Sequence, residues 1–202
     1  MSIILVGPTG FLGESFLRVR PNIVAVGRRS SFNPPFRHIN INSTFDFSPL
    51  DKENIEYAIF LIGSSDHNIL NNHPTIAFEM NVFPLSRFLH YMSLRKKPPK
   101  KIVTFTTMLQ YDSDKMKLPC DENQPIKSYV NNYVLSKVTA EQISKIYRKF
   151  FDIIDIRLSN VYGPTHLRRP DLIPSLMHSI LDNERTKVWT KKPSRDFVYV
   201  DD

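Results

Sequence analysis

The chain carries, from its third residue on, the stretch Ile3-Ile4-Leu5-Val6-Gly7-Pro8-Thr9-Gly10-Phe11-Leu12-Gly13. Four apolar residues run into three glycines spaced three apart, and a helical pattern follows. Glycines at such a turn let the backbone approach a pyrophosphate, whose charge meets the amide N–H groups of the helix N-terminus. The strand before the turn and the helix after it supply the context that a glycine pattern alone lacks. The stretch therefore predicts a dinucleotide site, with the cofactor-binding residues Gly7, Thr9, Gly10, Phe11, Leu12 and Gly13.

The remainder of the chain alternates short apolar runs with longer helical patterns. Further strands are predicted at 23–26, 58–62, 102–105, 153–158 and, more weakly, 39–41. Helices are predicted at 11–19, 75–94, 129–150 and 172–181, and a last strand at 197–200. Continuous apolar strands separated by helices are typical of a parallel sheet covered on both faces. We expect an α/β fold with a doubly wound, Rossmann-like sheet, in which Pro84 kinks or interrupts the second helix.

Composition narrows the class of protein. The 202 residues include one cysteine, Cys120, which cannot form an internal disulfide, so we expect a cytoplasmic protein. No apolar run approaches the roughly 20 residues that span a bilayer, and the six histidines lack metal-ligand spacing, so neither a membrane nor a metal is expected. The net charge of +7 favours anionic partners, including polyphosphate cofactors. The basic run at 95–101 is interpreted as a solvated loop, and no nucleic-acid partner is expected.

The residues after the second strand indicate which cofactor is bound. Proteins that prefer NAD place an acidic residue about 20 positions beyond the first glycine, where it binds the ribose. Here that position is Gly27, followed by Arg28 and Arg29. Two guanidinium groups without a carboxylate suit a 2′-phosphate. The sequence therefore favours NADP(H), with NAD(H) as the alternative and a solvated loop as the plainer interpretation.

A tyrosine and a lysine lie one helical turn apart in Tyr133-Val134-Leu135-Ser136-Lys137. A free tyrosine has a pKa near ~10, and a neighbouring ammonium favours the phenolate and lowers that pKa. Thr107 ends the strand that begins at Ile102, so its hydroxyl is expected at the edge of the sheet that faces the ligand. A surface Tyr–Lys pair would give the same short pattern.

Together, these segments resemble the extended short-chain dehydrogenase/reductase family, specifically its NAD(P)-dependent epimerase/dehydratase group, which acts mainly on nucleotide sugars. The resemblance is collinear along the whole chain. Besides the segments above it includes Asp46-Phe47, Leu61-Ile62-Gly63, Asn81, the stretch Arg157-Leu158-Ser159-Asn160-Val161-Tyr162-Gly163-Pro164, and Arg195-Asp196-Phe197-Val198-Tyr199-Val200-Asp201-Asp202.

The resemblance implies roles for these residues. Tyr133 exchanges a proton with the sugar, Lys137 binds the nicotinamide ribose, and Thr107 hydrogen-bonds the reacting oxygen. Further cofactor contacts are implied for Asp46, Phe47, Leu61, Ile62, Gly63 and Asn81. Asn160 and Arg195 match residues that hold the phosphates of the nucleotide sugar.

One departure from the family narrows the implied reaction. The 4,6-dehydratases carry Asp-Glu after the catalytic threonine, whereas Thr107 is followed by Met108-Leu109. Side chains without ionisable groups cannot transfer protons, so dehydration is not expected. A 4-epimerase and a keto-sugar reductase stay open, and the Arg28-Arg29 pair favours the reductase.

The end of the chain is the second departure, because relatives continue well beyond the motif that contains Asp202. We expect an NAD(P)-binding domain over 1–160 and an incomplete substrate lobe over 161–202, either in a fragment or in a natural short form. An enzyme is the first hypothesis. A cofactor-binding module without turnover, acting as sensor or scaffold, is the second. The resemblance also implies a homodimer formed through the helices predicted at 75–94 and 129–150.

Overall fold

A computed structural model describes residues 2–20, 22–28, 36–127, 129–165, 167, 171–185 and 194–202. The chain divides into two compact units, Met1–Leu158 and Ser159–Asp202, each described by itself. The boundary lies close to the predicted one, and the roles predicted for the two parts stay predictions.

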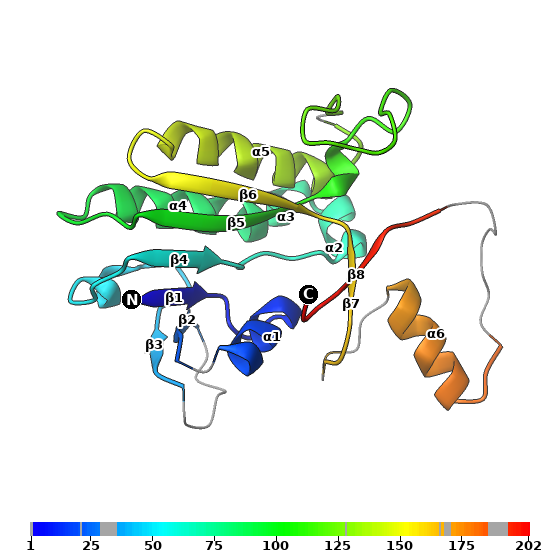
Figure 1. Ribbon diagram of the computed structural model, residues 1–202, viewed down its shortest axis with the longest axis horizontal. Coiled ribbons are helices and arrows are strands. Elements are labelled where there is room, and N and C mark those ends of the chain that lie inside the picture. The colour runs from blue at the N-terminus through cyan, green and yellow to red at the C-terminus, as the bar shows by residue number, and fades with distance from the viewer. Residues whose placement is uncertain are drawn as a thin grey trace. The chain divides into compact units, whose positions relative to one another are not determined.

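The first unit contains a six-stranded sheet in which every neighbouring pair is parallel. The strand order is β3-β2-β1-β4-β5-β6 (Figure 1). The strands are β1 (Ile3–Val6), β2 (Val24–Gly27), β3 (His38–Asn40), β4 (Tyr57–Phe60), β5 (Lys101–Thr107) and β6 (Asp152–Leu158). This order is that of a doubly wound dinucleotide-binding sheet, so the predicted fold class is confirmed.

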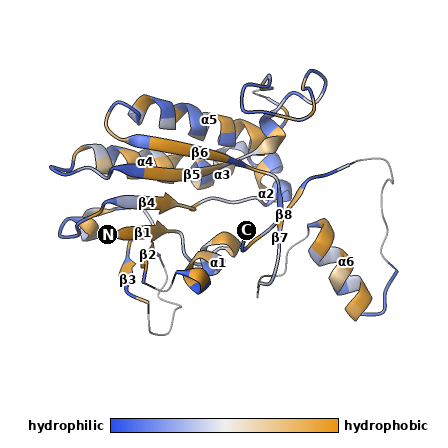
Figure 2. Cartoon of the chain, in the orientation of Figure 1, coloured by the Kyte–Doolittle hydropathy of each residue, from blue (hydrophilic) through white to orange (hydrophobic). Residues whose placement is uncertain are grey.

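The central strands β1, β2 and β4 are apolar, and helices cover them on both faces of the sheet. Leu5 and Ala25 pack with Leu17 of α1 (Phe11–Val19). On the other face, Ile4, Val6 and Val26 join a core with α4 (Phe83–Ser93) and α5 (Asn132–Tyr147), to which Phe88 and Ala140 contribute. Figure 2 shows hydrophobic colouring along the strands and mixed colouring on these helices. The result is one core layer on each face of the sheet.

The helix predicted at 75–94 is interrupted, as expected from Pro84. It consists of α3 (Pro74–Asn81) and α4, with Pro84 in the first turn of α4. Proline is tolerated there because the first N–H groups of a helix have no partner within that helix. The interruption allows Asn81 to end α3 beside the carboxyl end of β4, where it contacts the backbone of Ser64.

Three short elements of the first unit were not predicted. They are α2 (His67–Asn72) and the two 3₁₀ turns η1 (Ser48–Leu50) and η2 (Met108–Gln110). The helix α2 begins after Asp66, whose carboxylate accepts the backbone N–H groups of Asn68 and Ile69. A capped start with only six residues leaves little helical periodicity to detect.

The second unit contains β7 (Asn160–Tyr162), α6 (Leu172–Leu181) and β8 (Phe197–Tyr199). The two strands pair in parallel, with Asn160 opposite Phe197. The Tyr162 ring stands edge-on to the rings of Phe197 and Tyr199. The helix α6 has no buried residue. In the part of the chain that the structure describes, no helix has the length and apolarity to cross a membrane.

Candidate functional site

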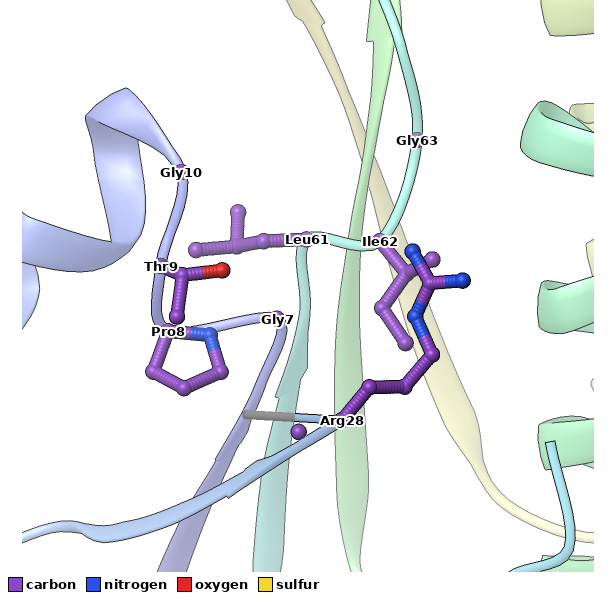
Figure 3. A pocket seen from close by; sticks show the side chains of 9 residues that line it. Gly7, Pro8, Thr9, Gly10, Arg28, Leu61, Ile62 and Gly63 are labelled. Carbon is purple, nitrogen blue, oxygen red and sulfur yellow. The ribbon is translucent and has the colours of Figure 1, made fainter. Parts of the chain in front are cut away.

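A pocket of about 300 Å³ lies where the order of the strands reverses, between β1 and β4. Ligands of open parallel sheets bind at this point, outside the carboxyl ends of the strands. Three segments line the pocket, each following a strand of the sheet (Figure 3). They are residues 7–10 after β1, 27–28 at the end of β2, and 61–63 after β4.

The glycine turn has the shape that its sequence predicts. Gly7 has φ of +90°, a conformation that side-chain-bearing residues rarely adopt, and a Cβ there would lie 2.8 Å from the backbone nitrogen of Ile62. A Cβ on Gly13 would lie 2.5 Å from the carbonyl oxygen of Pro8 and 2.6 Å from that of Gly7. Gly7 and Gly13 thus let β1, α1 and the segment after β4 approach one another. A Cβ on Gly10, in contrast, would meet no atom within 4 Å.

Gly10 is the N-cap of α1, and both Thr9 and Gly10 are exposed. The first N–H groups of a helix have no intrahelical partners and carry its positive dipole end. An anion placed in this pocket therefore meets backbone donors. Phe11 and Leu12, predicted as cofactor contacts, form the first turn of α1 and are half-buried.

Arg28 is exposed at the end of β2 and lines the pocket. Its guanidinium carbon lies 5.2 Å from the centroid of the Phe45 ring, within cation–π range. Phe45 has φ of +56° and immediately precedes Asp46. Two lining residues, Pro8 and Gly27, were not predicted as site residues. Arg29 lies outside the described residues.

The predicted Asp46-Phe47 pair adjoins Phe45 but has other partners as well. The Asp46 carboxylate accepts the backbone N–H of Ser48 at 2.9 Å and its hydroxyl at 3.0 Å. The Phe47 side chain is buried in the core, with its ring centroid 5.1 Å from that of Phe88. Contacts of this pair with adenine stay a prediction.

Asn81 connects the pocket to the helix that carries the Tyr–Lys pair. Its Oδ1 accepts the Ser64 N–H at 2.7 Å, and its Nδ2 donates to the Ser136 hydroxyl at 3.0 Å. A Cβ on Gly63 would lie 2.8 Å from the Asn81 Oδ1 and 3.2 Å from the Lys137 ammonium nitrogen. The pocket wall and the lysine are therefore close neighbours.

The ammonium of Lys137 donates to the carbonyl of Phe105 on β5, at 3.4 Å. Lys137 is half-buried. Burial disfavours the charged form and lowers the pKa of Lys137 to about 8. A ligand oxygen near this ammonium would accept a charge-assisted hydrogen bond, which is stronger than one between neutral groups.

Thr107 and Tyr133 are both buried, on elements that pack together. Thr107 ends β5, and α5 packs against β5 and against the η2 turn that follows Thr107. The Thr107 hydroxyl oxygen accepts the Leu109 N–H at 3.2 Å. That contact engages the oxygen and leaves the hydroxyl proton for donation to another oxygen. The predicted Thr107, Tyr133 and Lys137 thus lie on adjoining elements.

The unpredicted helix α2 supplies two neighbours of Tyr133. The His67 ring centroid lies 4.4 Å from that of Tyr133, and the Asn71 Oδ1 accepts the Tyr133 N–H at 3.1 Å. The Asn71 carbonyl accepts the Asn132 side-chain amide at 2.8 Å. The capping residue Asp66 was the one sequence signal that could have revealed this helix.

The predicted substrate residues Asn160 and Arg195 belong to the second unit. The Asn160 amide donates to the Asp196 carbonyl at 3.1 Å, which brings it close to the residue after Arg195. Arg195 is exposed. Their predicted role with the sugar nucleotide stays a prediction. Within the described residues, no three His, Cys, Asp or Glu side chains gather so that they could hold a metal ion.

Comparison with known proteins gives a family match over nearly the whole chain. The model of the NAD dependent epimerase/dehydratase family matches residues 3–202. A dTDP-D-glucose 4,6-dehydratase of Dictyostelium discoideum is 27% identical over 144 residues, which are 68% of this chain and 31% of that protein. The chain thus matches about a third of that relative's length.

Solved structures resemble the chain in fold. A UDP-N-acetylglucosamine 4-epimerase from Methanobrevibacter ruminantium M1, in complex with UDP-N-acetylmuramic acid, has a TM-score of 0.85 at 19% identity. The match covers 99% of this chain and 69% of that one. A dTDP-glucose 4,6-dehydratase from Streptomyces venezuelae, with NAD and TYD bound, has a TM-score of 0.80 at 18% identity and covers 100% and 69%.

Proposed function

The chain belongs to the NAD dependent epimerase/dehydratase family, and we propose that it is an NADP(H)-dependent oxidoreductase that reduces a keto group of a nucleotide sugar. The observation that carries the proposal is the link between the pocket and the proposed catalytic residues. Through Gly63 and Asn81, the pocket that suits a dinucleotide adjoins the helix with Tyr133 and Lys137.

The pocket suits a dinucleotide because backbone supplies much of it. Four of its nine lining residues are glycines, and it includes the N-terminus of α1. A pyrophosphate at Gly7–Gly10 would accept N–H donors, and the exposed Arg28 would pair with a 2′-phosphate on the adenosine ribose. The bound nicotinamide would supply or accept the hydride.

The proton transfer is assigned to Tyr133, with two neighbours assisting. Lys137 carries a positive charge below its pKa of about 8, and a nearby positive charge favours the ionised form of a phenol. The Thr107 hydroxyl, whose oxygen already accepts the Leu109 N–H, would donate to the substrate oxygen as negative charge develops. Tyr133 would then give its proton to that oxygen when hydride reaches the carbon.

Reduction is proposed rather than dehydration because of the two residues after Thr107. Met108 and Leu109 lie in the η2 turn, and neither side chain can transfer a proton. Water elimination needs an acid and a base at the sugar, which these residues cannot provide. Asn160 and Arg195 are proposed to bind the phosphates of the sugar nucleotide.

Turnover of a panel of keto-sugar nucleotides with NADPH and with NADH tests the proposal. We expect oxidation of NADPH with at least one substrate, and a loss of about 10²–10⁴-fold in kcat for Tyr133→Phe. Cofactor binding should survive in that variant. Tight NADPH binding without turnover on any substrate would favour a cofactor-binding module, and full turnover by Tyr133→Phe would refute the assignment of the proton donor.

A further inference from the structure

A buried carboxylate lies one helical turn beyond Lys137. Glu141 is on α5, and only 4% of its side chain is exposed. A charged group removed from water needs compensating partners, because the cost of dehydration is otherwise several kcal/mol. Lys145 of the same helix pairs with Glu141 at 3.6 Å, and its hydrogen-bond partners come from two neighbouring elements, β5 with its η2 extension and β6.

The contacts to β6 are made by one arginine. Arg157 donates from Nε to the Glu141 Oε2 at 3.1 Å and from Nη2 to Oε1 at 2.7 Å. Two parallel bonds between a guanidinium and a carboxylate fix the orientation as well as the distance. Burial opposes ionisation of Glu141, but the hydrogen bonds from Arg157 and Gln110 outweigh it and lower the pKa of Glu141 to about 2.

The contacts to the η2 turn are made on two consecutive residues. The fully buried Gln110 donates its side-chain amide to the Glu141 Oε2 at 2.8 Å. Arg157 donates to the Tyr111 hydroxyl at 3.0 Å and lies 5.1 Å from the centroid of its ring. The Glu141–Arg157 pair therefore holds Gln110 and Tyr111, which lie at the end of the turn that begins after Thr107.

We propose that Glu141 and Gln110 are positioning residues, which set the Thr107 hydroxyl at a fixed place relative to the Tyr133–Lys137 face of α5. The proposal rests on the proposed function, because it concerns the geometry of that same site. The Gln110–Glu141 bond is a direct side-chain link between the η2 turn and the catalytic helix. Without it the turn can shift along α5, and the hydroxyl shifts with it.

The contact between the α5 region and the sheet also contains a second ion pair, which serves as a matched control. Asp155 of β6 accepts a hydrogen bond from Arg148, just beyond the end of α5, at 2.9 Å, and from Thr104 of β5 at 2.5 Å. It too is a buried carboxylate that joins the α5 region to the sheet, with 3% of its side chain exposed. It lies away from the η2 turn. Loss of either pair should lower stability, but only one should displace Thr107.

The experiment compares Glu141→Gln, Gln110→Met and Asp155→Asn in the full chain. For turnover of a keto-sugar nucleotide with NADPH, we expect Glu141→Gln and Gln110→Met to lower kcat by about ten- to a hundredfold, because misplacement by about 1 Å costs that much. NADPH affinity should change little. Asp155→Asn should keep kcat within about twofold while unfolding at lower urea concentration.

Amide hydrogen exchange supplies a second measurement that does not depend on turnover. The Leu109 N–H bonds to the Thr107 hydroxyl, and the Lys127 N–H bonds to the Gln110 carbonyl at 2.8 Å. Both amides should exchange faster in Glu141→Gln and Gln110→Met than in the parent protein, relative to amides of α1, and should be unchanged in Asp155→Asn. Gln110→Met keeps the Glu141–Arg157 pair and so remains informative if Glu141→Gln does not fold.

The outcomes separate this proposal from the proposed function. Equal effects of Asp155→Asn and Glu141→Gln on kcat and on the two amides would overturn the positioning role. Unchanged kcat and unchanged exchange in Gln110→Met would do the same. If the parent protein shows no turnover on any substrate, the proposed function fails, and the exchange of the Leu109 and Lys127 amides alone decides whether Gln110 and Glu141 hold the turn.

Discussion

Two glycines of the same turn have opposite surroundings, and this gives the first prediction. Gly13→Ala adds a Cβ 2.5 Å from a backbone oxygen, so α1 must move, at a cost of about 1–3 kcal/mol of folding free energy. Gly10→Ala adds a Cβ into open space and should cost less, about 0.5–1 kcal/mol, because alanine is a poorer N-cap than glycine, while weakening NADPH binding by occupying the approach to the helix N-terminus. Urea unfolding and NADPH titration measure both effects. Equal losses of stability would contradict this account.

Arg28 is predicted to decide the preference for the phosphorylated cofactor. Arg28→Ala should weaken NADPH binding by about tenfold or more, since a hydrogen bond to a charged group contributes about 1.5–3 kcal/mol. NADH binding should change little. Arg37→Ala is the control, because it removes the same charge from a residue that pairs with Glu53. Parallel losses of NADH and NADPH affinity in Arg28→Ala would show that Arg28 does not read the 2′-phosphate.

For single residues, the sequence predicted which of them line the pocket better than it predicted what surrounds each side chain. Gly7, Thr9, Gly10, Arg28 and Gly63 line the pocket, as their places after strands indicated. The type of a residue does not show which residues from distant parts of the chain will pack against it. Pro8 was passed over inside the turn itself, and the core packing of the Phe47 ring depends on helix α4, which lies far along the chain.

Helix α5 carries the next prediction, which concerns pH. Burial lowers the pKa of Lys137 to about 8, against 10.5 ordinarily. Below pH 8 both the folded and the unfolded chain hold the proton, so the cost of burying the charge is constant. Between those two pKa values only the unfolded chain holds it, so stability rises with pH through this window, by up to about 3 kcal/mol.

Urea unfolding of the parent chain and of Lys137→Met across this window measures that rise. The variant lacks the titrating ammonium, so the unfolding free energy of the parent should rise relative to that of the variant as the pH increases. A difference that stays constant with pH would mean that the Lys137 ammonium remains hydrated in the folded state.

Helices and strands were predicted well where packing against the core imposes a repeating apolar pattern on the sequence, and poorly where it does not. The central strands β1, β2 and β4 are apolar because helices cover their part of the sheet on both sides, and that requirement is visible in the sequence. Pro84 marked the break between α3 and α4 for a reason local to the backbone. The six-residue α2 is stabilised by the Asp66 cap and by its contacts with α5, and neither leaves a repeating pattern. As a result His67, whose ring lies 4.4 Å from that of Tyr133, was missed.

The charge of the whole molecule leads to a prediction about salt. A net charge of +7 attracts anions, and NADPH carries a further phosphate compared with NADH. Between about 0.1 M and about 1 M salt the screening length falls from about 10 Å to about 3 Å. NADPH affinity should therefore fall about tenfold more than NADH affinity over this range. Fluorescence titration of both cofactors checks this, and equal salt slopes would contradict it.

The collinear motifs indicated the family from the sequence alone, and the family match over residues 3–202 confirms it. Relations between the two units and between copies of the chain depend on surfaces rather than on periodic packing, so sequence patterns specify them weakly. The homodimer through α3, α4 and α5 and the sugar-phosphate role of Asn160 and Arg195 therefore stay predictions.

The pocket wall contains four glycines, Gly7, Gly10, Gly27 and Gly63, among nine residues. At these four positions the wall presents backbone rather than side chains to a ligand. Alanine scanning identifies contacts by deleting side-chain atoms, and these four positions have none to delete, so it would pass over this part of the pocket. The glycine part of the pocket has to be mapped by adding atoms, one methyl group at a time. Among natural variants, those that replace one of these glycines with a larger residue are therefore expected to lose ligand binding.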